Sequence, residues 1–311
     1  MTVETLEIGP EALLDGVRDS TGESPVWDAT RGRWFWTDIP GRVIRRLDPE
    51  SGAIRSWRLA EMAGCLALRP DRGSGPHPGL VCACESGIFD VALPEHDGAE
   101  AAAMTRLASV SHPRAGMRFN DGRCDRQGRF LASTMVSDTS LGDPSGRWHR
   151  FTGRGGLEEA GLGGLIVPNG SAFSPDGRVF YASGTDPRER MVWAFDYDTE
   201  SGALANRRVF VDMRGMVGLP DGATVDAAGG YWSCALGEGC IKRFTPEGVL
   251  DRIVRVPMRK PTMCALGGAD GQSMLVTSLG GADREDDPHG GRVALFRLPG
   301  VRGIAEPRFA G

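Results

Sequence analysis

Short hydrophobic runs alternate with polar turns along the whole chain. In one such stretch, the turn at residues 174–177 (SPDG) is followed at once by the strand-like run 178–181 (RVFY). Asp and Gly favour the turn, and the β-branched and aromatic residues after it favour a strand. The same pattern recurs at residues 28–39, 125–135, 226–236 and 269–279, and at 70–88 with a longer loop in place of the tight turn. The chain is therefore a series of repeated β units.

The repeats have a nearly constant length. Their turn residues lie 43, 54, 51, 50 and 44 residues apart, and they are Asp28, Asp71, Asp125, Asp176, Asp226 and Asp270. A second pair of strand-like segments follows each turn and strand, so every repeat supplies about four strands. Such a sheet cannot bury both faces alone, whereas six sheets arranged radially cover one another. We therefore expect an all-β chain, with a single six-bladed β-propeller domain over residues 1–311 and four-stranded blades around a central channel.

The N-terminal segment lies outside the repeats. Residues 4–8 (ETLEI) have the pattern of one further strand, and we expect this strand to join the last blade and close the ring. Only residues 10–16 (PEALLDG) fit a short helix.

The composition is consistent with many short strands and argues against nucleic-acid and membrane partners. The chain has 45 Gly and 20 Pro, which are typical of frequent turns. The balance of 36 Lys and Arg against 41 Asp and Glu gives a net charge of -5, which argues against a nucleic-acid partner. No apolar run approaches the roughly 20 residues of a membrane span, and the N-terminus has no pattern of a secretory signal. We expect a cytoplasmic protein with no membrane partner; the sequence specifies no oligomeric state.

Cysteine and histidine give no support for a zinc site or a disulfide framework. The seven Cys include no C-x-x-C pair, and most lie in apolar stretches where free Cys packs as a small hydrophobic residue. The five His are scattered and form no H-E-x-x-H motif. A histidine-based metalloenzyme is therefore not expected.

Polar residues recur five positions before the turns. In a propeller the innermost strand of each blade lines the channel, and this position lies near the start of that strand, at one channel mouth. Four of the six repeats carry a carboxylate or amide there, and these residues are Glu23, Asn120, Asn169 and Asp221, with Asn169 counted from Ser174, where its turn begins. The other two repeats have Gly64 and Thr262 near the same register.

Two carboxylates and two amides at one axis indicate a cation site. Close carboxylates raise each other's pKa unless a cation neutralises them. Their oxygens suit one divalent cation, with Ca²⁺ favoured and Zn²⁺, Mn²⁺ or Mg²⁺ as alternatives. The Asn or Asp of a PNG or PDG triplet can also simply stabilise a turn. The shared register favours the cation site, and Glu23, beside Ser24 and Pro25, has no such role in a turn. Asp121 and Asp226 are expected to stabilise turns.

Several stretches together resemble the SMP-30/gluconolactonase/luciferin-regenerating enzyme-like family. They are GESPVWD (22–28), RFNDGRCDRQGRFLASTM (118–135), PNGSAFSPDGRVFYASGT (168–185), LPDGATVDAAGGYWSCAL (219–236) and GG (267–268). The resemblance runs along nearly the whole chain and implies a six-bladed propeller with one divalent cation at the channel mouth. The family's metal ligands fall on Glu23, Asn169 and Asp221.

The resemblance also implies substrate contacts. They fall on Arg118 and Asn120, the latter also close to the cation, and an acidic residue shortly after the TM dipeptide corresponds to Asp138. Met117 departs from the polar residue that many family members have before the arginine. The alternative role for Arg118 is a salt bridge at the rim, with Asp138 or another acid.

The family's usual reaction is hydrolysis of a sugar lactone (aldonolactone) to the aldonic acid. A cation would polarise the lactone carbonyl and stabilise the developing oxyanion. No Ser-His or Cys-His pair is apparent, so direct attack by water is favoured. Asp221 is the expected general base, with a cation-bound hydroxide as the alternative because a cation lowers the pKa of a bound carboxylate.

Two other functions remain as alternatives. One is a non-catalytic calcium-binding or interaction propeller, against which the carboxylates at the axis argue. The other is hydrolysis of another ester or a phosphotriester in the same pocket, which the loops around the mouth would decide.

Overall fold

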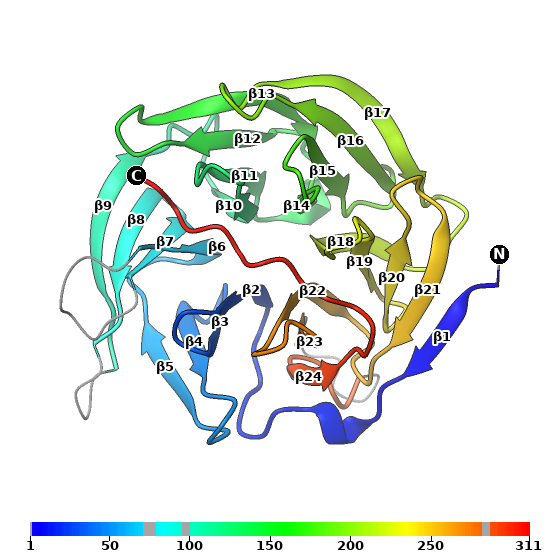
Figure 1. Cartoon of the computed structure of the whole chain (residues 1–311). Helices are drawn as coiled ribbons and strands as arrows, with labels where there is room; N and C mark the ends of the chain where they lie inside the picture. The colour runs from blue at the N-terminus through cyan, green and yellow to red at the C-terminus, as the bar shows by residue number, and fades with distance from the viewer. Residues whose placement is uncertain (1, 71–78, 95–99, 282–286) are drawn as a thin grey trace.

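The repeats form six sheets arranged around a common axis (Figure 1). The structure is a computed structural model of the chain, and it describes residues 2–70, 79–94, 100–281 and 287–311. Apart from the N-terminal strand, the strands of each blade follow one another outward in chain order and pair antiparallel with their neighbours. The predicted six-bladed β-propeller is confirmed. The turn expected at Asp71 lies outside the described residues.

The innermost strands bend just after they begin. These strands are β2 (Gly22–Asp28), β6 (Ala63–Leu68), β10 (Met117–Cys124), β14 (Pro168–Phe173), β18 (Leu219–Val225) and β22 (Pro261–Gly267). In all six, the pairing with the second strand shifts register within the first few residues. Such a β-bulge re-aims the side chains next to it. The bulges coincide with the register predicted to face the channel mouth.

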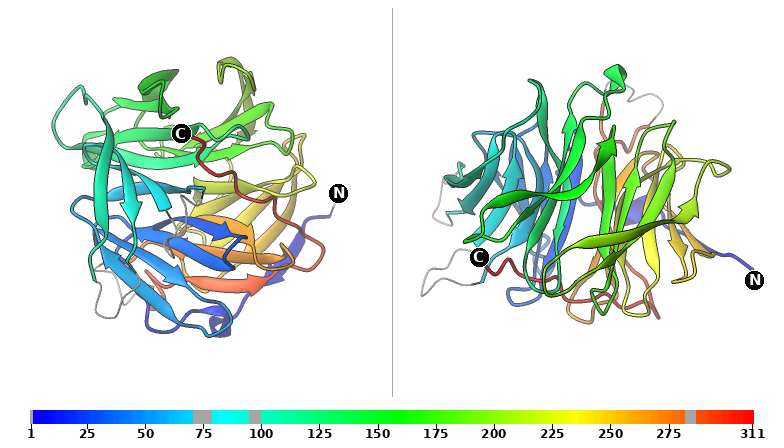
Figure 2. Two further views of the ribbon diagram at one scale, coloured as in Figure 1. Left: turned by 60° about the vertical axis from the view of Figure 1, so that its left-hand side comes forward. Right: turned by 90° about the horizontal axis from the view of Figure 1, so that it is seen from above.

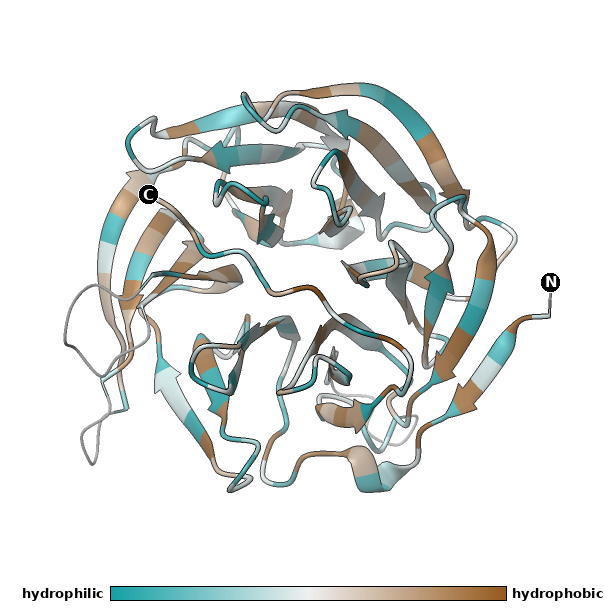
Figure 3. Cartoon of the chain, in the orientation of Figure 1, coloured by the Kyte–Doolittle hydropathy of each residue, from teal (hydrophilic) through white to brown (hydrophobic). Residues whose placement is uncertain are grey.

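The remaining strands build the blades outward. The second strands are β3 (Arg33–Asp38), β7 (Gly79–Cys84), β11 (Phe130–Val136), β15 (Val179–Gly184), β19 (Tyr231–Leu236) and β23 (Ser273–Ser278). The third strands are β4 (Val43–Leu47), β8 (Gly87–Ala92), β12 (Gly146–Phe151), β16 (Met191–Tyr197), β20 (Cys240–Phe244) and β24 (Ala294–Arg297). The outer strands are β5 (Ile54–Arg58), β9 (Ala103–Ser109), β13 (Leu157–Leu165), β17 (Leu204–Asp212) and β21 (Leu250–Arg255). The outer strands carry a mixture of hydrophobic and hydrophilic residues (Figure 3), and that of the fourth repeat is largely exposed.

The N-terminal strand joins a different blade from the one expected. β1 (Glu4–Glu7) pairs in parallel with β21 of the fifth blade. The chain then forms the short 3-10 helix η1 (Pro10–Ala12), and Leu13 makes a single bridge to Ala294 of the sixth blade. Apolar side chains of this segment pack against the core shared by these two blades, and this burial favours a path that spans both. The prediction that residues 4–8 extend the last blade was therefore wrong.

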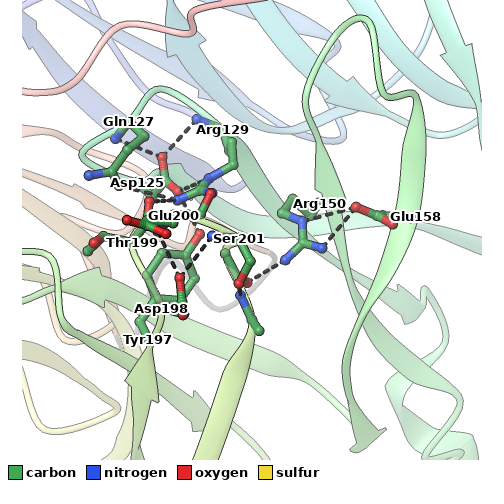
Figure 4. A network of polar contacts seen from close by, with 12 residues as sticks. Asp125, Gln127, Arg129, Arg150, Glu158, Tyr197, Asp198, Thr199, Glu200 and Ser201 are labelled. Carbon is green, nitrogen blue, oxygen red and sulfur yellow. Dashed lines mark hydrogen bonds and ion pairs between the residues drawn. The ribbon is translucent and has the colours of Figure 1, made fainter.

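The aspartate of a turn can link neighbouring blades through hydrogen bonds, as Asp125 shows (Figure 4). Its carboxylate accepts the backbone N–H groups of Gln127 at 3.0 Å and Arg129 at 2.8 Å. The Tyr197 hydroxyl, from the fourth blade, donates to the same carboxylate at 2.6 Å. Arg129 pairs with Asp125 and donates to the carbonyl oxygen of Thr199 at 2.8 Å. One recurring residue thus shapes its own turn and links two blades.

The cysteines pack as expected from their apolar surroundings. All seven are free and buried. In the part of the chain that the structure describes, no helix has the length and apolar character needed to span a membrane.

The last ten residues, 302–311, cross the face of the propeller that carries the turns, and we call them the C-terminal strap (Figures 1 and 2). Phe309 is fully buried and stacks on Phe151 of the third blade, with 5.1 Å between ring centroids and 11° between ring planes. Its backbone N–H donates to the carbonyl oxygen of Leu68 in the second blade at 2.7 Å. The strap therefore ties the end of the chain to blades on the far side of the ring.

Replacing Phe309 by alanine is expected to lower the free energy of unfolding by about 3–5 kcal/mol, because it empties a packed site. Equilibrium urea unfolding measures this change. Val217→Ala is the control, since Val217 is 67% exposed and its truncation is expected to change stability by less than about 0.5 kcal/mol. Equal effects of the two substitutions would show that the strap does not stabilise the ring.

Candidate functional site

Five of the six residues predicted for the site lie at one end of the innermost strands. Glu23 lies on β2, Arg118 and Asn120 on β10, Asn169 on β14 and Asp221 on β18. Each is at or next to the bulge of its strand. All except Arg118, which is partly exposed, are buried. Four different blades thus contribute polar side chains to one end of the ring.

The two equivalent positions without a carboxylate or amide have packing roles. A Cβ on Gly64 would lie 2.3 Å from the carbonyl oxygen of Phe119, so only glycine allows β6 and β10 to approach so closely there. The Thr262 hydroxyl donates to the carbonyl oxygen of Gly22 at 2.5 Å, and so joins the sixth blade to the first.

A chain of side-chain hydrogen bonds joins three blades across the site. Asn120 Nδ2 donates to Asn169 Oδ1 at 2.9 Å, and Asn169 Nδ2 donates to Asp221 Oδ1 at 2.7 Å. Asn169 Nδ2 also donates to the Thr185 hydroxyl, which in turn donates to the carbonyl oxygen of Pro220, both at 2.7 Å. These bonds fix the orientation of the Asp221 carboxylate before any ligand binds.

Glu23 completes the site from the first blade. Its carboxylate accepts the backbone N–H of Ser24 at 3.3 Å. Ser24 has a φ of 53°, in the left-handed region that non-glycine residues seldom adopt, so the bulge here is strained. Burial raises the pKa of Glu23 well above its usual range, and the charges of Asp221 and Asp121 raise it further. Burial and the charge of Asp121 likewise raise the pKa of Asp221.

Asp121 brings a third carboxylate, which the sequence led us to expect in a turn. β10 continues to Cys124, and the bulge after Phe119 leaves Asp121 inside the strand and buried. Its Oδ2 accepts the backbone N–H of Ser171 at 2.7 Å, while its buried Oδ1 has no hydrogen-bond partner among the described residues. Burial raises its pKa. By contrast, Asp226 does stabilise its turn, by accepting the backbone N–H groups of Ala228 and Gly230, both at 2.9 Å.

Arg118 lies against Asn120 and forms no salt bridge with Asp138 within the described structure. Its Nη1 donates to Asn120 Oδ1 and to the carbonyl oxygen of Phe119, both at 2.8 Å. Burial lowers its pKa, an effect that the carboxylates of Glu23 and Glu85 oppose.

Asp138 stands apart from the other five predicted residues. It is exposed and caps the 3-10 helix η2 (Thr139–Leu141), where its side chain accepts the backbone N–H of Ser140 at 3.1 Å. Over the residues that the structure describes, no hydrogen bond or ion pair joins it to the rest of the site. Met135 on β11 pairs with Arg118 on β10, and Asp138 follows Met135 by three residues. The loop that carries Asp138 therefore lies at the same end of the blade as Arg118.

The chemistry of these donors fits a divalent cation. Within the described ranges no cluster of three or more His, Cys, Asp and Glu could hold a metal ion, but this site combines two carboxylates, on Glu23 and Asp221, with the amide of Asn169. Neither carboxylate forms an ion pair within those ranges, and both are buried, so a cation would offset their repulsion. The amide of Asn169 can present oxygen in place of nitrogen by rotating about its last side-chain bond.

Comparison with known proteins fixes the family. The model of the SMP-30/gluconolactonase/LRE-like region matches residues 21–280. The chain belongs to this family. The resemblance to this family, which the sequence motifs indicated, is therefore confirmed.

Relatives within the SMP-30/gluconolactonase family include enzymes for several sugar lactones. The chain is 36% identical to the 6-deoxy-6-sulfogluconolactonase of Pseudomonas putida, over 93% of this chain and 95% of that protein. It is 32% identical to the L-arabinolactonase of Azospirillum brasilense, over 97% and 96%. It is also 31% identical to the regucalcin of Xenopus laevis, over 93% and 95%.

Solved structures of the family share the whole fold. A calcium-binding protein, regucalcin, from Agrobacterium tumefaciens superposes with a TM-score of 0.86 and 25% identity, over 100% of both chains. A luciferin-regenerating enzyme superposes with a TM-score of 0.83 over 94% of this chain and 96% of that one, at 23% identity.

Proposed function

We propose that this protein is a metal-dependent sugar lactonase that holds one divalent cation on Glu23, Asn169 and Asp221. The observation that carries the proposal is the pair of buried carboxylates, without ion pairs in the described structure, at one end of the innermost strands. The lactonases among its relatives support the substrate class, and the likeness to a calcium-binding regucalcin supports a cation. Ca²⁺ is favoured, and Mg²⁺, Mn²⁺ and Zn²⁺ also accept these ligands.

The residues of the chain divide the chemistry among them. A bound cation would supply Lewis-acid polarisation of the lactone carbonyl and stabilise the charge that develops on its oxygen. Asp221 takes the proton of the attacking water, and before a cation binds the hydrogen bond from Asn169 holds its carboxylate in one orientation. The site is largely closed to solvent, which strengthens each of these electrostatic interactions.

Substrate hydroxyl groups would bind beside the carboxylates. Asn120 lies next to Asn169, and Arg118 uses one nitrogen within the protein. Its remaining donors form no hydrogen bond with the described residues, so they can bind ring or hydroxyl oxygens in a fixed fork. Asp138 would approach the substrate from the loop that follows β11.

Arg118→Lys is expected to raise KM for the lactone about tenfold, because lysine lacks the planar fork. The value of kcat is expected to change less, since the substitution removes no group that moves a proton. Steady-state kinetics at saturating cation measure both constants. Arg114→Lys is the matched control, because Arg114 is exposed and pairs with Asp143 on a neighbouring loop. An unchanged KM in Arg118→Lys would remove this residue from the substrate site.

A lactone panel tests the proposal. Acid release is measured with glucono-, xylono-, arabino- and galactonolactone, first with protein treated with chelator and then after adding each divalent cation. At least one lactone is expected to be hydrolysed, with activity lost on chelation and restored by a cation. Absence of hydrolysis with every lactone and cation would contradict the proposal.

A second candidate function is cation binding without catalysis. The likeness to the regucalcin of Agrobacterium tumefaciens, a calcium-binding protein, favours it. The same panel separates the two functions, because a non-catalytic propeller would bind Ca²⁺ in calorimetry and hydrolyse none of the lactones.

A further inference from the structure

We propose that Arg123 is a positioning residue, a brace that holds the third and fifth blades at the separation the cation site requires, and that the C-terminal strap holds Arg123 in place through Glu306. The inference rests on the proposed function, because it assigns a purpose to groups that lie behind the proposed ligands.

Arg123 connects two blades that are not neighbours. It lies on β10, and its Nη2 donates to the carbonyl oxygen of Ala223 on β18 at 3.0 Å. Its Nη1 lies 3.3 Å from the Thr224 hydroxyl, to which it also donates. β10 belongs to the third blade and β18 to the fifth, and β14 of the fourth blade lies between them in the ring (Figure 1).

The two strands that Arg123 joins carry most of the site. Asn120 precedes it on β10 by three residues, and Asp221 precedes Ala223 on β18 by two. The hydrogen bonds from Asn120 through Asn169 to Asp221 link the same strands nearer their starts. Arg123 thus joins β10 directly to β18 at a different depth from the amide chain, and losing it would remove this direct link between the two strands.

Glu306 of the C-terminal strap is the counter-ion of the brace. Its carboxylate lies 3.2 Å from Arg123 Nη1, and the two side chains are only 20% and 10% exposed. Burying a guanidinium to this extent costs free energy unless an opposite charge pairs with it. The positive charge of Arg123 also acts on Asp121, where it opposes the rise in pKa caused by burial. Without Glu306 an uncompensated positive charge would lie behind a site that must attract a cation.

The strap fixes Glu306 from both sides. Before it, the carbonyl oxygen of Arg302 accepts the backbone N–H of Ala227 at 2.8 Å. After it, Arg308 pairs with Asp28 of the first blade at 2.5 Å, and Phe309 is buried. Because these contacts already order the segment, little further conformational entropy is lost when Glu306 pairs with Arg123.

Three variants of the full-length protein test the inference. Glu306→Gln keeps the shape but removes the counter-charge, and Arg123→Lys keeps the charge but cannot reach both acceptors on β18. Arg308→Gln is the matched control, because it removes another ion pair of the same strap that contacts the first blade instead. Ca²⁺ affinity is measured by calorimetry without substrate, and kcat and KM are measured with a hydrolysed lactone.

The expected result is about tenfold weaker Ca²⁺ binding in Glu306→Gln and in Arg123→Lys, with the loss of activity mainly in kcat. Arg308→Gln is expected to bind Ca²⁺ within about twofold of the wild type. Wild-type affinity in Glu306→Gln, or equal weakening in Arg308→Gln, would overturn the inference and leave the lactonase proposal intact. A wild-type protein that binds no cation would overturn both. Glu306→Gln is nearly isosteric, so it decides the question even where Arg123→Lys fails to fold.

Discussion

Replacing Asp221 by asparagine is expected to reduce kcat for lactone hydrolysis by about 1000-fold, because the substitution removes the proposed base and one charge of the cation site. Asparagine keeps the volume of the side chain and an oxygen that can accept from Asn169, so the amide chain that joins three blades can persist. The measurement is acid release by variant and wild type, each at saturating cation and lactone.

Two comparisons sharpen this test. Asp212→Asn is the control, because Asp212 lies at the end of the outer strand β17 and pairs with the exposed Arg214. Its activity is expected to stay within about twofold of the wild type. Glu23→Gln removes a proposed ligand but no base, so extra cation is expected to restore part of its activity. A loss smaller than about tenfold in Asp221→Asn at saturating cation would contradict the role given to this residue.

Removing the cation is expected to destabilise the protein more at pH 8 than at pH 5. Burial raises the pKa of Glu23 and Asp221, so in the folded protein these carboxyls hold protons more tightly than in the unfolded chain. The favourable contribution of these two carboxyls to the free energy of unfolding is present below their pKa in the unfolded chain, which is about 4. It is lost as the pH rises through their higher pKa in the folded protein. A cation offsets the repulsion of the ionised pair, so its stabilising effect grows over the same range.

Thermal unfolding with chelator and with Ca²⁺ at the two pH values measures this effect. At a free Ca²⁺ concentration about 100 times the dissociation constant, the cation is expected to add about 2.7 kcal/mol to the free energy of unfolding at pH 8. The increment is expected to shrink at pH 5, where protons compete for the same oxygens. An equal Ca²⁺ effect at the two pH values would show that the cation binds away from Glu23 and Asp221.

The sequence predicts the blades well because each blade is encoded locally. A turn acid such as Asp125 shapes the few residues around it, and its strands pair with their neighbours in the chain. The site follows from the same repeat, since the residue five positions before the turn falls at the bulge in the first, third and fifth blades, and Asn169 holds the same place five positions before Ser174. Glu23, Asn169 and Asp221 could therefore be placed from their register alone.

Features that depend on distant contacts were not visible in the sequence. The N-terminal strand pairs with β21, about 250 residues away in the chain, and no local pattern selects that edge over β24. Asp121 has the same neighbours as a turn acid, and only the bulge in β10 shows that it is enclosed. The contact between Arg123 and β18 joins residues 100 apart in the chain, so no local pattern predicts it.

Anomalous scattering from a crystal soaked with Mn²⁺ tests most directly whether the carboxylates of the first and fifth blades hold a cation. We expect one strong peak, at about 2.0–2.4 Å from oxygen atoms of Glu23, Asn169 and Asp221, and its loss in Asp221→Asn. A peak elsewhere in the protein, or none at these three side chains while the soaked protein hydrolyses lactone, would contradict it.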